Sequence, residues 1–198
     1  MRVLVFGAGS LGSLLGGLLA RSHDVTLVGR DPHVERVRAD GLRITGEYAE
    51  RVEPAATASV PAETFDLAVV AVKAYDTPAA AEALGAADLD AVLSVQNGLG
   101  NEATLAGALD AAVLAGTCTY GARLTGPGVV DCTGRGEVAL GPPAGGQSAV
   151  ADAVGAALRA ADVEAVVAAD MPRRSWEKLA VNAGINAVTA LARVENGA

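Results

Sequence analysis

The sequence predicts an α/β fold, a doubly wound and mostly parallel sheet with helices on its faces. Short apolar segments of strand length alternate with helix-length segments over the first 117 residues, which is typical of parallel strands joined by crossover helices. Hydrophobic residues make up 51% of the chain but aromatic residues only 3%, so Ala, Val, Leu and Ile must build the core. The 198 residues suffice for one such domain and the beginning of a second.

The first elements form one β-turn-α-β unit. Arg2–Phe6 is expected to be a buried strand, and a glycine-rich turn leads from it into an apolar helix that ends near Ala20. His23–Val28 then supplies a second strand. A unit of about 30 residues has the size that a parallel crossover requires.

The remaining elements continue this alternation. Leu42–Val52 has the pattern of a short hairpin or an irregular strand pair. The glycine-rich stretch 121–146 is expected to hold a terminal hairpin made of Val129–Cys132 and Glu137–Leu140. Other expected strands are Leu67–Val72, Ala91–Val95, Val113–Thr117 and an edge strand at Val163–Val167. Expected helices are Asp31–Asp40, Thr77–Gly85, Asn101–Leu109 and Ser148–Ala160.

The last segment predicts one long helix, from about Pro172 to Arg193. The domain boundary is expected near Ala168–Pro172, which divides the chain into residues 1–170 and residues 171–198. Because this helix has nothing of its own to pack against, we expect it to be the first helix of an otherwise absent all-α domain. Its exposed apolar face would offer a surface for homo-oligomerisation.

Composition excludes several classes of partner. The formal net charge of −8 repels nucleic acid and anionic membranes, and no apolar stretch approaches the roughly 20 residues of a membrane span. The first residues lack the pattern of a signal peptide, which favours a cytoplasmic protein. Two cysteines and two histidines without metal-ligand spacing predict no metal site.

The glycine-rich turn predicts a dinucleotide site of the Rossmann type. Gly7, Gly9 and Gly12 follow a buried strand and open a helix, the context in which this spacing is informative. The three glycines permit a tight turn, close approach of a pyrophosphate, and close packing of helix on strand. A glycine turn without a ligand is the less favoured alternative. The candidate cofactor residues are Gly7, Ala8, Gly9, Ser10, Leu11 and Gly12.

The end of the second strand indicates which dinucleotide is bound. An acidic residue about 20 positions after the turn would bind the ribose 2′-hydroxyl of NAD, but the sequence has Gly29 there and then Arg30. An arginine can pair with the 2′-phosphate of NADP, so NADP is favoured. Asp31 leaves NAD open, because its carboxylate could take the ribose role.

Two further polar residues follow expected strands. Lys73 comes after the buried run that ends at Val72, and Asn97 lies in the turn after Val95. Open α/β sheets bind ligands at the carboxyl ends of their strands, so both side chains are candidates for the cofactor crevice. A solvated lysine and a simple turn residue are the alternatives.

The last helix carries a polar row. Lys178, Asn182 and Asn186 are spaced by four residues and therefore share one helix face. Their neighbours are mostly apolar, and a buried polar row needs partners. The carboxylate and carbonyl of a substrate would be such partners. The alternative is that the row faces water and the apolar residues face the core.

These motifs together resemble the ketopantoate reductase family, NADPH-dependent enzymes of pantothenate synthesis. The resemblance runs over the whole chain, and the C-terminal motif is its most specific part. The motifs are the 7–12 turn, Val72-Lys73-Ala74, Gln96-Asn97-Gly98, Gly116-Thr117 with Ala122, and Trp176-Glu177-Lys178-Leu179-Ala180-Val181-Asn182 with Ile185-Asn186.

The resemblance implies roles for individual residues. Lys73, Asn97 and Ala122 would help hold NADPH, and Lys178 would be the catalytic acid. Hydride would pass to C2 of a 2-oxo acid, converting 2-dehydropantoate to pantoate for coenzyme A synthesis, while Lys178 would protonate the ketone oxygen. The residues expected to contact substrate are Asn97, Lys178, Asn182, Asn186 and Asn196.

Two other functions stay open. A β-hydroxyacid dehydrogenase of the 6-phosphogluconate type shares the domain plan and a lysine–asparagine helix, although the turn at Asn97 favours the first interpretation. A non-catalytic NADP-binding sensor or scaffold is also possible, because the family's C-terminal domain is missing beyond its first helix. For the same reason, the isolated chain would bind NADPH but turn over weakly or not at all.

Overall fold

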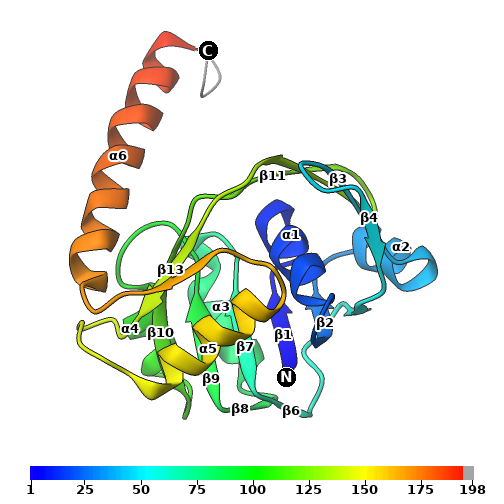
Figure 1. Cartoon of the computed structure of the whole chain (residues 1–198), viewed down its shortest axis with the longest axis horizontal. Helices are drawn as coiled ribbons and strands as arrows, with labels where there is room; N and C mark the ends of the chain where they lie inside the picture. The colour runs from blue at the N-terminus through cyan, green and yellow to red at the C-terminus, as the bar shows by residue number, and fades with distance from the viewer. Residues whose placement is uncertain (194–198) are drawn as a thin grey trace.

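The computed structural model describes residues 1–193, apart from the side chain of residue 186. An eight-stranded sheet forms its centre (Figure 1), with neighbouring strands parallel except for one antiparallel pair, β10 and β13. The predicted doubly wound, mostly parallel α/β fold is therefore confirmed. In spatial order the strands are β14 (Ala165–Val167), β13 (Val138–Gly141), β10 (Ala112–Cys118), β9 (Ala91–Ser94), β7 (Leu67–Val70), β1 (Arg2–Phe6), β2 (Asp24–Val28) and β5 (Ala55–Thr57).

The chain order reverses at β1, which lies between β2 on one side and β7 on the other. A crevice at the carboxyl ends of strands around such a reversal is the usual ligand site of open α/β sheets. The expected helices are present with small shifts at their ends. They are α1 (Ser10–Leu19), α2 (His33–Asp40), α3 (Thr77–Leu84), α4 (Asn101–Ala106), α5 (Ala149–Ala160) and α6 (Met171–Ala192). A short 3-10 helix that was not expected, η1 (Ala74–Asp76), precedes α3.

Both faces of the sheet are buried, so its strands read as continuous apolar runs. In β1, Val3 and Val5 belong to the core cluster that includes Leu14 of α1. Leu4 points to the opposite face and joins the cluster of Leu84 in α3. Successive residues of β1 therefore pack on opposite faces of the sheet. Because both faces are buried, Val3, Leu4 and Val5 are all apolar and the sequence shows no alternation with polar residues.

A second sheet of four strands lies over α1 (Figure 1), in the order β11-β12-β3-β4. It joins the predicted hairpin near residue 45 to the glycine-rich stretch after residue 120. Leu124 donates its backbone N–H to the Ser10 hydroxyl at 3.1 Å, so this sheet also contacts the first turn of α1. Its strands are β11 (Gly121–Gly126), β12 (Val129–Gly134), β3 (Leu42–Gly46) and β4 (Glu50–Val52), while a two-stranded pair is formed by β6 (Thr64–Phe65) and β8 (Asp88–Leu89).

The predicted pairing of Val129–Cys132 with Glu137–Leu140 is wrong. The first segment lies in β12 and pairs with β11, whereas the second lies mostly in β13 and pairs with β10 of the main sheet. The tight turn at Gly128, with φ of +71°, closes the actual hairpin. The backbone N–H of Thr119 bonds to the carbonyl of Glu137 at 3.0 Å, which directs the chain back along β10 instead.

His33 connects this second sheet to the helices beneath it. Gly128 donates its N–H to Nδ1 at 3.1 Å, so the ring proton must sit on Nε2, which donates to the Ser13 hydroxyl at 3.0 Å. Protonation of Nδ1 would break the bond to Gly128. The neutral ring therefore fixes the β11–β12 turn against α1 and α2.

We expect the free energy of unfolding to fall as pH drops through the ordinary histidine pKa of about 6.5. Burial lowers the pKa of His33 in the folded protein, so the unfolded chain takes up the proton first and gains free energy from it. The expected loss is about 1 kcal/mol, the worth of one hydrogen bond. Urea unfolding between about pH 7.5 and 5.5 measures it, and a His33→Leu variant with the same pH dependence would contradict the assignment.

The long helix α6 is predicted correctly, and it extends away from the body of the protein (Figure 1). Its first residue, Met171, is fully buried against Ala115 and Ala139 of the main sheet. No helix in the described part of the chain is long and apolar enough to cross a membrane. Farther along α6, large apolar side chains are exposed, namely Trp176, Val181, Ile185, Val188 and Leu191.

Candidate active site

The glycine-rich turn has a distinct steric reason for each glycine. A Cβ on Gly12 would collide with the carbonyl oxygen of Gly7, and a Cβ on Gly7 would lie 2.6 Å from Cγ1 of Val72. Gly7 also has φ of +102°, which side chains rarely adopt. Gly9 differs, because its nearest surrounding atom would be 4.0 Å away. Open space at Gly9 is what the approach of a pyrophosphate requires.

Helix α1 begins at this turn without a side-chain cap, and its first turn contains no acidic residue. The first N–H groups of a helix have no partner within the helix, and the helix dipole favours an anion there. The turn and the start of α1 therefore fit a dinucleotide phosphate. The predicted residues that the structure brings together here are Gly7, Ala8, Gly9, Ser10, Leu11 and Gly12.

The end of β2 excludes an acidic side chain at position 29. A Cβ on Gly29 would lie 2.7 Å from the Cβ of Ala8 and 3.0 Å from Val34, so any larger residue would collide with the turn. Arg30 is exposed, and among the described residues its guanidinium has no hydrogen bond or ion pair. Asp31 is exposed as well. Position 29, where an NAD enzyme would have the acidic residue that binds the ribose hydroxyl, thus has no room for a side chain. The next residue is Arg30, whose guanidinium makes no ion pair within the described part of the chain.

Lys73 and Asn97 both lie beyond the carboxyl ends of central strands, as expected. Lys73 follows β7 by three residues and is exposed. Asn97 follows β9 by three residues and is exposed as well. Ala122 is half-buried in β11, two residues from the contact between Leu124 and Ser10. All three therefore come from segments that border the turn or the neighbouring strand ends.

A buried hydrogen-bond network supports the Asn97 turn. Gln96 donates to the Thr77 hydroxyl at 2.8 Å, and Ser94 donates to Gln96 at 3.2 Å. The Thr77 hydroxyl shares its one proton between Oδ1 of Asn101 at 2.9 Å and the carbonyl of Ala74 at 2.8 Å. Asn101 in turn donates to the carbonyl of Asn97 at 3.2 Å. Sequence reasoning missed this network, since its members are spread over residues 77–101 and only the polar Gln96 after an apolar strand signals it.

We expect Thr77→Val to destabilise the protein by about 2 kcal/mol or more. Valine keeps the shape but leaves buried donors and acceptors of Gln96 and Asn101 without their partner, and each such loss costs about 1–3 kcal/mol. Thr77→Ser keeps the hydroxyl and should cost clearly less. Urea unfolding compares them with Thr104→Val, an exposed hydroxyl on α4; equal effects of the two valine variants would contradict a supporting role for the network.

Lys178 lies against the end of β10. Its ammonium donates to the carbonyl oxygen of Cys118 at 3.0 Å, and its side chain is half-buried. Burial lowers the pKa of Lys178 below its ordinary value, since desolvation disfavours the charged form. The ammonium lines a small cleft together with Gln96, Gly98, Glu102, Gly116, Thr117, Ser175 and Leu179.

The two members of the polar row whose side chains the structure describes, Lys178 and Asn182, face the protein body. Asn182 is half-buried and donates to Oδ1 of Asn97 at 3.4 Å, so the row meets the turn after β9. The alternative orientation is wrong, since Val181 and Ile185 of the same helix are exposed instead. The side chain of Asn186 and all of Asn196 lie outside the described residues. The structure therefore brings together Lys178, Asn182 and Asn97.

The residue types that bind metals or form disulfides do not gather at this cleft. Among residues 1–193, no group of three or more His, Cys, Asp or Glu side chains could hold a metal ion. Cys118 and Cys132 are both buried and free. The two thiols are therefore not linked to each other, and the backbone carbonyl of Cys118 accepts the hydrogen bond from Lys178.

Comparison with known proteins agrees with this arrangement. Residues 3–145 match the family model described as Ketopantoate reductase PanE/ApbA. The chain is 49% identical to a 2-dehydropantoate 2-reductase of Halobacterium salinarum, over 100% of this chain and 68% of that protein. It is 38% identical to a 2-dehydropantoate 2-reductase of Pyrococcus abyssi, over 99% of this chain and 66% of the relative.

Solved structures give the same result. A PanE/ApbA family ketopantoate reductase from Ralstonia eutropha superposes with a TM-score of 0.88 and 34% identity, over 98% of this chain and 65% of that one. D-mandelate dehydrogenase, solved with NADH and anilino(oxo)acetate, has a TM-score of 0.86 at 23% identity and covers 96% of this chain and 64% of that one; it shares the fold. The chain spans about two thirds of the length of these proteins, and it belongs to the ketopantoate reductase PanE/ApbA family of oxidoreductases.

Proposed function

We propose that this chain is the cofactor-binding and acid-bearing part of an NADPH-dependent 2-dehydropantoate 2-reductase. The observation that carries the proposal is the meeting of α6 with the strand ends, where Lys178 bonds to Cys118 and Asn182 to Asn97. A general dinucleotide-binding domain has no reason to bury an ammonium there. The names of the relatives supply the substrate, 2-dehydropantoate.

NADPH fits the residues of the turn and its surroundings. The pyrophosphate would lie over Gly9 and the first N–H groups of α1, and Arg30 would pair with the 2′-phosphate. Lys73, Asn97 and Ala122 would hold the remainder of the cofactor. When bound, NADPH supplies the hydride that reduces a carbonyl carbon.

The side chains at the cleft would handle charge and protons. As C2 of the 2-oxo acid accepts a hydride, negative charge develops on the ketone oxygen. The Lys178 ammonium would donate a hydrogen bond and then its proton to that oxygen, and its lowered pKa makes it a stronger acid. Asn97 and Asn182, with Asn186 and Asn196, would donate to the carboxylate and hydroxyl oxygens of the substrate.

The experiment combines a binding and a turnover measurement. NADPH binding is monitored by fluorescence energy transfer from Trp176 to the bound NADPH. Trp176 is the only tryptophan of the chain and lies two residues from Lys178. NADPH oxidation with 2-dehydropantoate is monitored by the loss of NADPH absorbance. We expect binding, and turnover only with Lys178 present; absence of NADPH binding would contradict the cofactor assignment, and preferential binding of NADH would contradict NADP specificity.

Three further expectations belong to this proposal. Residues 1–170 would form the NADP-binding domain, and residues 171–198 the first helix of a helical substrate domain. The reduction of 2-dehydropantoate would take place in the cytoplasm as a step toward coenzyme A. The exposed apolar residues of α6, Val181 and Leu191 among them, would favour self-association of the isolated chain.

A further inference from the structure

A second cavity lies near the opposite end of α1 from the glycine turn. Its volume is about 530 Å³, within the range of small-ligand sites. Because α1 has ten residues at a rise of 1.5 Å each, about 15 Å separate its two ends. Neither Lys178 nor any residue of the turn borders the cavity. It is lined by Tyr48, Tyr120, Arg135, Gly136, Arg159, Asp162, Val163 and Glu164.

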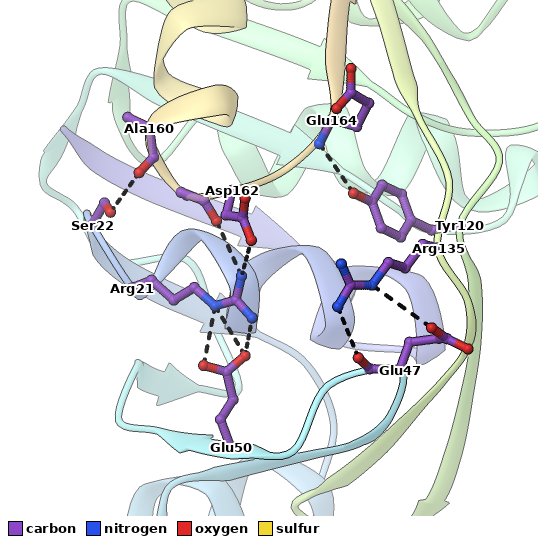
Figure 2. Close-up of polar contacts among 10 residues, drawn as sticks. Arg21, Ser22, Glu47, Glu50, Tyr120, Arg135, Ala160, Asp162 and Glu164 are labelled. Carbon is purple, nitrogen blue, oxygen red and sulfur yellow. Dashed lines mark hydrogen bonds and ion pairs between the residues drawn. The ribbon is translucent and has the colours of Figure 1, made fainter.

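Most acidic groups around this cavity already have partners (Figure 2). Glu50 and Asp162 both pair with Arg21, the second at 3.6 Å. Glu47 pairs with Nε of Arg135 at 3.8 Å. The carboxylate of Glu164 points away from Tyr120 and Arg135, whereas its backbone N–H points toward Tyr120 (Figure 2). Negative charge is therefore largely neutralised or directed out of the cavity.

The two arginines at the cavity, in contrast, have N–H groups that make no hydrogen bond within the described part of the chain. Arg159 donates from Nη1 to the carbonyl of Ala165 at 3.0 Å and has no carboxylate partner among the described residues. Arg135 lies over the ring of Tyr48, 4.5 Å from its centroid, which fixes the guanidinium plane at the wall. Its Nη2 uses only the carbonyl of Glu47, at 3.2 Å. Both guanidinium groups therefore keep N–H groups for a ligand.

Two tyrosines, Tyr48 and Tyr120, form part of the cavity wall. The oxygen of Tyr120 accepts the N–H of Glu164 at 3.1 Å, and its hydroxyl also forms a side-chain hydrogen bond with Tyr48. Burial raises the pKa of Tyr120 to about 12, which keeps the hydroxyl protonated. Tyr48 and Tyr120 are both buried, and their rings provide firm apolar walls next to the charged groups.

We propose that this cavity binds a small organic anion through a carboxylate or phosphate group held by Arg135 and Arg159. A guanidinium group can donate two parallel hydrogen bonds to two oxygens of a carboxylate or of a phosphate, a geometry that chloride does not offer. The proposal does not depend on the reductase function, because the cavity shares no residue with the Lys178 cleft.

The test measures thermal stabilisation of the whole chain by two probes, sodium phosphate and sodium malonate, against sodium chloride at equal ionic strength. We expect a saturable rise of Tm with at least one probe. Arg135→Gln and Arg159→Gln should each weaken the fitted affinity about tenfold or more, as expected for loss of a charged hydrogen bond. Arg43→Gln, an exposed arginine of β3 outside the cavity, should leave it unchanged, and Arg159→Lys should restore part of it.

The outcomes separate the alternatives. A response to malonate alone or to phosphate alone supports the site and identifies which group it takes. Stabilisation of equal affinity in the parent and in both cavity variants would place the anion elsewhere, for instance at the glycine turn, and would overturn the proposal. Absence of any rise beyond that with chloride would overturn it too. The Tm of each variant without probe reports whether it folds.

Discussion

Replacing Lys178 with alanine is expected to lower turnover of 2-dehydropantoate about 10²- to 10⁴-fold, the usual range for loss of a general acid. The half-buried ammonium, bonded to the carbonyl of Cys118, is the only described cation that borders the cleft next to Asn97. The dissociation constant of NADPH should change little, because the glycine turn and Arg30 belong to other elements. Steady-state NADPH oxidation and fluorescence titration measure the two effects separately.

Arg173→Ala is the matched control for this variant. Arg173 lies on the same helix, pairs with Glu177 at 2.7 Å and is exposed, so its removal should leave both kcat and NADPH binding near the parent values. Turnover by Lys178→Ala equal to that of the control would remove the lysine from the mechanism.

The pH dependence of turnover independently tests the role of Lys178 as the acid. Burial lowers its pKa in the folded protein, so the ammonium loses its proton at lower pH than a free lysine with a pKa of about 10.4. Because the acid must be protonated, kcat should decline as pH rises through this lowered value. An alkaline limb that survives unchanged in Lys178→Arg would belong to another group, since arginine stays charged throughout.

The sequence predicts the main sheet well because its central strands are buried and mostly apolar. Leu67–Val70 and Ala91–Ser94 are buried on both faces, and such runs between glycine and polar segments are hard to misassign. The glycine-rich stretch 121–146 is mispaired for the opposite reason. Its short strands alternate weakly, and register there depends on contacts with Leu42–Gly46, about 90 residues earlier, which no local pattern encodes.

In the candidate site, too, some features are predictable from local sequence and others depend on contacts between distant residues. The glycine turn is predictable because the spacing of Gly7, Gly9 and Gly12 lies within six consecutive residues. The polar row of α6 is predictable because its four-residue spacing lies within one helix. The support of Asn97 by Thr77 and Asn101 depends on tertiary contacts between three elements. Likewise, the cavity lined by Arg135 and Arg159 joins distant loops. Local sequence pattern locates the candidate residues of the site, whereas the contacts that support them can be seen only in the folded structure.

Replacing Arg30 with alanine is expected to weaken NADPH binding about 10- to 100-fold while leaving NADH binding unchanged. A charged hydrogen bond contributes about 1.5–3 kcal/mol, and each 1.4 kcal/mol corresponds to a factor of ten. The guanidinium has no ion pair to lose in the described part of the chain, so the effect should appear in binding and not in stability. Titrations of both cofactors, with unfolding curves beside them, separate these contributions.

Two controls decide between the arginine and its acidic neighbour. Arg36→Ala removes a cation from the exposed face of α2, where it pairs with Asp40, and should change neither cofactor's affinity by more than about twofold. Asp31→Ala should strengthen NADPH binding slightly if the carboxylate only repels the 2′-phosphate. A loss of NADH binding in Asp31→Ala would instead show that this carboxylate takes the ribose role. Because a Cβ at position 29 would collide with Ala8, no acidic residue can enter there, and the ratio of the two affinities must depend on residues 30 and 31.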